Sequence, residues 1–198
     1  MLRRELPALI GVLVCAAVPL AAQRLTSDEQ TVEEIRHAVL KLPYYGAFDH
    51  LAFEYDKGTV ILSGYVYQPS LKRDVVSAVK RVPRVDEVVD RIEELPASQN
   101  DDTIRWRTFY RIYGDSVLSR YAPGGGLSRF DLRYYSRYPG TQPYGDYPIQ
   151  IIVKGGRTTL RGVVDSEFDK RIAGVRAREV FGTFGVENKL VVLDAKGR

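Results

Sequence analysis

The chain has 198 residues and a formal net charge of +4, and 44% of its residues are hydrophobic and 27% charged. This is an ordinary globular composition, with length for one large domain or two small ones. Its single cysteine, Cys15, lies in an apolar run at the N-terminus, so removal of that run excludes disulfides and thiol chemistry.

The first 22 residues have the pattern of a secretory signal peptide. Arg3 and Arg4 make a short basic start, residues 6–22 are apolar or small, and the run ends in PLAAQ. We expect cleavage after Ala22, with cleavage one residue earlier or later as close alternatives. An uncleaved anchor is the other interpretation, although the run contains two prolines and is at the lower edge of spanning length. Lipidation is disfavoured, because valine rather than a small residue precedes the cysteine. Either way, the rest of the chain is expected in the periplasm or otherwise exported, or anchored by its N-terminus.

Charge is distributed unevenly between the two halves. Residues 23–100 carry 10 basic and 13 acidic side chains, whereas residues 101–198 carry 17 basic and 11 acidic ones. The excess of positive charge in the second half indicates an anionic partner. Export argues against nucleic acid, which leaves anionic phospholipid headgroups, acidic glycans or an acidic protein.

The first half of the chain predicts the order helix, strand, strand, helix, strand. Thr31 and Glu34 fit a capping box at the start of the first helix, and Pro69 suits the first turn of the second. Asp56-Lys57-Gly58 fits a tight hairpin turn between the two alternating strands. The elements are expected at residues 32–42 (helix), 51–55 and 60–66 (strands), 69–82 (helix) and 88–92 (strand).

The same order returns in the second half. GTVILSGYV at 58–66 recurs as GRTTLRGVV at 156–164, and the match continues without a gap from 58–95 onto 156–193. Such self-similarity indicates an internal duplication. The second set of elements is expected at residues 106–117 (a helix with an aromatic face), 149–153 and 157–164 (strands), 166–181 (helix) and 184–192 (strand).

The predicted fold class is therefore α+β: two tandem αββαβ two-layer sandwiches, each burying one sheet face under two helices. We expect a first domain at 28–95, a short linker at 96–101 and a second domain at 102–194.

This pattern resembles the BON domain (bacterial OsmY and nodulation). The second copy carries the family's closing pattern as Val186, Asn188, Leu190 and Val192, whereas the first departs from it with Asp90 and Glu94. The resemblance covers nearly all of the chain after residue 22, twice. It implies an exported or membrane-linked protein, a phospholipid-binding or interaction module, and no catalytic residues.

The repeated glycines are interpreted as structural. Gly58 and Gly156 lie at turns, where positive φ favours glycine. Gly64 and Gly162 lie inside strands, where glycine marks a bulge or a close backbone approach, and we expect the following helix as the neighbour. A phosphate-binding loop is the alternative, but the Lys-Ser/Thr that such a loop requires is missing.

Nothing in the sequence predicts catalysis. The only histidines are His37 and His50, and no cluster of metal-ligating residues surrounds either. Asp49-His50 could be drawn into a triad, but no serine is selected as its nucleophile. We therefore expect no enzymatic activity, no metal and no cofactor.

Two surfaces of the second copy are candidate binding sites. The first is a long insert at about 121–147, rich in tyrosine and arginine, which is either a loop packed on the domain or a surface for an anionic partner. The second is the basic side of the last helix, which is either solvated or in contact with anionic lipid. The candidate residues are Arg129, Arg133, Tyr134, Tyr135 and Arg137 in the insert, and Lys170, Arg171 and Arg178, beside Arg176, on the helix.

Two functions follow from these surfaces. The chain is either a non-enzymatic envelope protein that binds anionic phospholipid or a membrane surface, or a module that docks envelope proteins through the insert. Phe168, Ile172 and Val175 are expected to face away from the basic side of the last helix.

Overall fold

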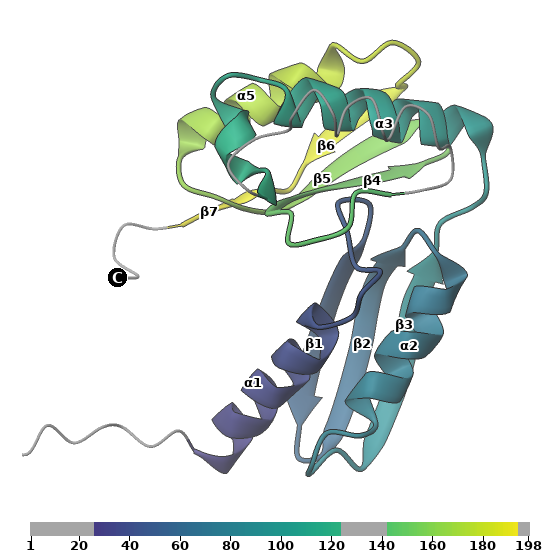
Figure 1. Ribbon diagram of the computed structural model, residues 1–198, viewed down its shortest axis with the longest axis vertical. Coiled ribbons are helices and arrows are strands. Elements are labelled where there is room, and N and C mark those ends of the chain that lie inside the picture. The colour runs from purple at the N-terminus through teal and green to yellow at the C-terminus, as the bar shows by residue number, and fades with distance from the viewer. Residues whose placement is uncertain (1–25, 124–141, 194–198) are drawn as a thin grey trace, which may run out of the picture.

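The computed structural model describes residues 26–123 and 142–193, which form two α+β units (Figure 1). The predicted fold class is confirmed: in each unit, two long helices lie on one face of a sheet.

The first unit contains a three-stranded sheet in the order β1-β2-β3, with β1 antiparallel and β3 parallel to β2. Fully buried aliphatic side chains, among them Ile35, Leu62 and Leu71, fill the space between sheet and helices. Its elements are α1 (Ser27–Leu40), β1 (His50–Asp56), β2 (Thr59–Val66), α2 (Pro69–Val79) and β3 (Glu87–Glu94).

The predicted capping box of α1 is wrong by more than one turn. The helix begins at Ser27, and its capping box is formed by Thr26 and Glu29. Thr31 is instead buried within the helix, where its hydroxyl donates to the Ser27 carbonyl and accepts from Arg84 Nε. Both Thr26 and Thr31 have a glutamate three residues later, so the motif alone did not select the helix start.

The second unit repeats the topology around β4, β5 and β6, with β7 also paired to β5. Its first helix begins at Gln99 with Ser98 as the N-cap, so residues 99–101 of the expected linker are its first turn. The predicted closing strand is divided at residues 189–190 into β6 and β7, and Leu190 is buried in the core. The elements are α3 (Gln99–Tyr113), the 3-10 helix η1 (Leu118–Tyr121), β4 (Ile149–Lys154), β5 (Arg157–Val164), α5 (Glu167–Arg178), β6 (Gly185–Asn188) and β7 (Val191–Val192).

The strand glycines lie against backbone of the neighbouring strand rather than against the following helix. Gly64 has φ +121°, and a Cβ added there would lie 2.0 Å from the carbonyl oxygen of His50. Gly162 has φ +108° and would place a Cβ 2.0 Å from the Pro148 oxygen. The neighbour expected from the sequence was therefore wrong, because the close approach occurs within each hairpin.

The two units interlock through residues 43–49, the connection between α1 and β1. This interlocking segment leaves the first unit and reaches β4 of the second (Figure 1). Ala47 accepts a 2.8 Å hydrogen bond from the Ile151 amide and donates one of 3.0 Å to the Pro143 carbonyl. Phe48 is completely buried in the second unit's core, where its ring meets the edge of Trp106 at 5.1 Å.

A buried carboxylate fixes the end of the interlocking segment. Asp49 accepts hydrogen bonds from the amides of Gly46 (2.9 Å) and Tyr67 (2.7 Å) and from the Gln142 side chain (2.9 Å). Burial raises the pKa of Asp49 to about 6, although these three hydrogen bonds act in the opposite direction. Asp49 therefore connects the first unit to the segment just before β4.

Phe48→Ala should destabilise the second unit although Phe48 belongs to the first repeat. Removing a buried phenylalanine costs about 3–5 kcal/mol. Urea unfolding followed by the fluorescence of Trp106, the chain's only tryptophan, should show this loss. Phe181→Ala is the control, because Phe181 is 86% exposed and its loss should change stability by less than about 0.5 kcal/mol. Equal stabilities for the two variants would contradict the interlock.

The free energy of unfolding should fall as pH rises from about 4 to 6 because of Asp49. Its pKa is higher in the folded protein than the ordinary value of 3.8, so the native state binds the proton more tightly. One pKa unit corresponds to about 1.4 kcal/mol, so this contribution is of the order of 3 kcal/mol. Urea unfolding at several pH values should show a smaller decline for Asp49→Asn; an unchanged decline would contradict the assignment.

Candidate functional site

The sequence-predicted site residues divide into two groups. Arg129, Arg133, Tyr134, Tyr135 and Arg137 lie outside the described residues, so their role stays a prediction. Lys170, Arg171 and Arg178 lie on α5, the second helix of the second unit.

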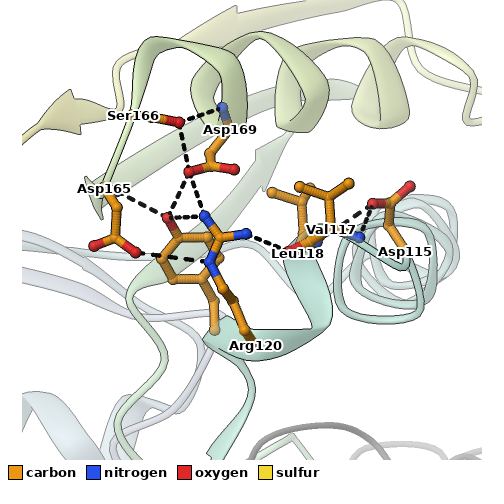
Figure 2. A network of polar contacts seen from close by, with 8 residues as sticks. Asp115, Val117, Leu118, Arg120, Asp165, Ser166 and Asp169 are labelled. Carbon is orange, nitrogen blue, oxygen red and sulfur yellow. Dashed lines mark hydrogen bonds and ion pairs between the residues drawn. The ribbon is translucent and has the colours of Figure 1, made fainter.

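A buried aspartate holds the start of α5 in place (Figure 2). Asp169 is 1% exposed and accepts hydrogen bonds from Arg120 (2.5 Å), Tyr121 (3.0 Å) and Ser166 (2.7 Å). The Ser166 hydroxyl in turn caps the helix by accepting from the Asp169 amide. The Tyr121 hydroxyl also accepts from the amide of Asp165. The first turn of α5 is therefore tied to η1.

A second carboxylate ties the last turn of α5 to the turn that follows α3. Asp115 accepts a 2.7 Å hydrogen bond from Arg176 Nε and further bonds from the amides of Val117 and Leu118. Burial acts to raise the pKa of Asp115, but these hydrogen bonds and the Arg176 charge lower it below its ordinary value. Arg176 also pairs with Glu179 at 3.2 Å. This arginine is therefore held by carboxylates on the protein.

The outer face of α5 combines cationic and apolar side chains. Phe168, Arg171, Val175 and Arg178 are spaced i, i+3, i+7 and i+10, which places them on one side of the helix. Phe168 is 51% exposed and Val175 40%, and both arginines are exposed. The expectation that the apolar residues of α5 face away from the arginines is therefore wrong for Phe168 and Val175, whereas Ile172 packs against the core.

Small residues on the inner side of α5 explain this orientation. Ala173, Gly174 and Ala177 face the sheet, and a Cβ added to Gly174 would lie 2.8 Å from Asn188 Nδ2. The same Asn188 nitrogen donates to the Lys170 carbonyl at 2.7 Å, and Lys170 itself is half-buried. The helix thus lies too close to the sheet for larger residues inside.

Two further exposed phenylalanines lie in the turn that follows α5. Phe181 is 86% exposed and Phe184 76%. The turn that carries them is ordered by two hydrogen bonds, from Arg107 to the Phe181 carbonyl and from the Phe184 amide to the Gly156 carbonyl. We call the six residues Phe168, Arg171, Val175, Arg178, Phe181 and Phe184 the α5 surface.

The first unit lacks this surface although the two copies align without a gap. Its equivalent positions keep both cations but replace every apolar residue with a polar residue or proline. They are Ser70, Arg73, Ser77, Lys80, Pro83 and Asp86. The α5 surface therefore belongs to the second copy alone, and Arg171 and Arg178 form no ion pair within the described ranges.

Asp49 and His50, the two residues that could be drawn into a triad, each bind a structural partner. Asp49 binds the interlocking segment, and the His50 ring contacts Gln150 at 2.7 Å. Across residues 26–123 and 142–193, no helix is both long and apolar enough to cross a membrane.

The chain matches a known domain family. The BON domain matches residues 27–96 and again 141–194, so the chain belongs to the BON domain family and carries two copies. The predicted resemblance is confirmed. The second match begins after α3, although α3 occupies the place of the first helix in that unit.

Comparison with solved structures gives distant likenesses. Two are to CdsD, a structural protein of the type III secretion system of Chlamydia trachomatis, each at 13% identity. The first has a TM-score of 0.28 and covers 85% of this chain and 95% of that one; the C-terminal domain of CdsD has a TM-score of 0.26, with 82% and 97% covered. Likenesses this distant do not bear on function. No curated protein matches the chain.

Asp169→Ala should loosen α5 from η1. The change leaves Arg120 and Tyr121 without their shared acceptor, and a hydrogen bond to a charged group contributes about 1.5–3 kcal/mol. Urea unfolding should show this loss, and amide exchange in the first turn of α5 should accelerate. Asp165→Asn is the control, because Asp165 is 61% exposed and 3.7 Å from Arg120, so its loss should cost less than about 1 kcal/mol.

Proposed function

We propose that this protein is a non-enzymatic envelope protein whose second BON domain binds anionic phospholipid surfaces through the α5 surface. The BON family is regarded as a phospholipid-binding or interaction module, and a signal peptide would bring the chain to the envelope. The observation that carries the proposal is the exposed combination of phenylalanine and arginine in the second copy, absent from the first.

The chemistry of the α5 surface suits a lipid headgroup region. Burying one phenylalanine side chain in an apolar environment contributes about 1.5–3 kcal/mol. An arginine near an anionic leaflet contributes about 1 kcal/mol, and its guanidinium can bind phosphate oxygens through two hydrogen bonds. Three exposed phenylalanines and two unpaired arginines therefore favour binding to a membrane, which has anionic headgroups outside and apolar chains beneath them.

The alternative is docking of an envelope protein by the Tyr/Arg-rich insert at 121–147. Most of that insert lies outside the described residues, so no contact here favours it over lipid. Pull-down from envelope extract with the insert deleted distinguishes it, since unchanged partners would exclude this route.

Arg171→Gln combined with Arg178→Gln should weaken binding to vesicles of phosphatidylcholine and phosphatidylglycerol by about tenfold or more. Sedimentation with vesicles measures this, and added salt should reduce wild-type binding as well. Phe168→Ser combined with Phe181→Ser should weaken binding while leaving the net charge unchanged.

The matched control is Arg73→Gln combined with Lys80→Gln, the aligned cations of the first copy. This variant removes the same charge and should bind like the wild type. Equal wild-type binding to pure phosphatidylcholine vesicles, no binding to either vesicle, or an equal loss in the control would contradict the proposal.

A further inference from the structure

A small polar pocket lies where the first sheet meets the second unit. It has a volume of about 190 Å³. The strand register places Ala52, Ser63 and Arg91 in one row across the first sheet. His50, Tyr65 and Glu93 form the next row, and Arg161 from β5 of the second unit completes the wall.

Contacts between the units hold the two sides of this pocket together. Gln150 is the cross-strand partner of Arg161. Its Oε1 accepts a hydrogen bond from the His50 ring at 2.7 Å, and its Nε2 donates to the Tyr45 hydroxyl at 2.8 Å. Lys154 and Glu93 form an ion pair of 2.7 Å across the same junction. A hydrogen bond and an ion pair therefore join the two units beside the pocket.

The pocket has positive charge that the protein does not neutralise. Arg91 and Arg161 come from different units, and neither takes part in an ion pair within residues 26–123 and 142–193. Arg161 Nε is buried and has no hydrogen-bond partner among the described residues. A buried donor without a partner is costly, as is the presence of two like charges at one junction.

The remaining charged and titratable groups do not remove this excess. Glu93, the one carboxylate in the pocket wall, is already paired with Lys154. Burial lowers the pKa of His50, which leaves the imidazole neutral near pH 7. The two guanidinium groups therefore determine the charge of the pocket.

We propose that this pocket binds a phosphate group, held between Arg91 and Arg161 and bridging the two BON domains. Guanidinium groups bind phosphate oxygens through paired hydrogen bonds, and the hydroxyls of Ser63 and Tyr65 in the wall are further donors. The volume is below the roughly 300–1,000 Å³ of sites for drug-sized ligands and equals that of about six waters at ~30 Å³ each. It therefore suits inorganic phosphate or the phosphate of a headgroup.

The test measures thermal unfolding and titration calorimetry of the full chain with sodium phosphate, against sodium chloride at equal ionic strength. Phosphate should give a saturable rise in Tm, because a ligand that binds only the folded state stabilises it. Arg161→Gln and Arg91→Gln should each weaken phosphate binding by about tenfold or more. Arg91 is exposed, so its variant keeps the test valid if Arg161→Gln fails to fold.

The α5 variant with Arg171→Gln and Arg178→Gln is the matched control and should bind phosphate like the wild type. It also separates this site from the proposed lipid surface, since either can fail without the other. If phosphate competes with anionic vesicles, and Arg91→Gln weakens both phosphate binding and vesicle binding, the phosphate comes from a lipid headgroup. If vesicle binding is unaffected by phosphate and by Arg91→Gln, the ligand is free phosphate. No response beyond that to chloride, or the same response in both arginine variants as in the wild type, would overturn the proposal.

Discussion

The burial of Phe48 in the core of the second unit is the contact on which the arrangement of the two domains depends. The residue precedes β1 of the first repeat, yet its neighbours include Trp106 and Phe109 of α3. Because an aromatic side chain contributes a large buried area, the second core is incomplete without a residue from the first repeat. The hydrogen bonds of Ala47 and the carboxylate of Asp49 then orient the segment around this anchor.

The interlocking segment holds the two duplicated domains in one arrangement. Separate domains joined by a short linker would be free to reorient. Here β1 and β4 are brought to a common junction, so His50 contacts Gln150 and Glu93 pairs with Lys154. The proposed phosphate pocket exists only because this junction brings Arg91 of the first unit and Arg161 of the second to the same pocket.

The two copies share a scaffold and differ on their surfaces. Gly64 and Gly162 occupy equivalent strand positions and face equivalent carbonyl groups, because both hairpins close in the same way. The outer helix faces have diverged: Arg73 and Lys80 are flanked by serines, whereas Arg171 and Arg178 are flanked by Phe168 and Val175. The proposed lipid-binding surface therefore arises from substitutions on the outer helix face, while the fold of the two copies stays the same.

The sequence predicts the structure least well where two local motifs fit the same role equally well. Thr31 with Glu34 and Thr26 with Glu29 both fit a capping box, and only the second is used, because Thr31 is needed inside the fold beside Arg84. Similarly, Phe168 and Val175 were expected to face away from the basic side of α5, but both lie beside its exposed arginines. Their exposure follows from the close helix–sheet packing at Gly174, which the pattern of one helix does not contain.

The sequence by itself determined the α+β class, the duplication, the turn at Gly58 and the family, because these depend on local periodicity and on positions that recur 98 residues apart. Only the tertiary structure decided where residues 43–49 go, which face of α5 is exposed and which arginines meet. Those outcomes depend on contacts between segments distant in the chain. Phe48 in a short connection looks like any exposed loop residue until the second unit's core is assembled around it.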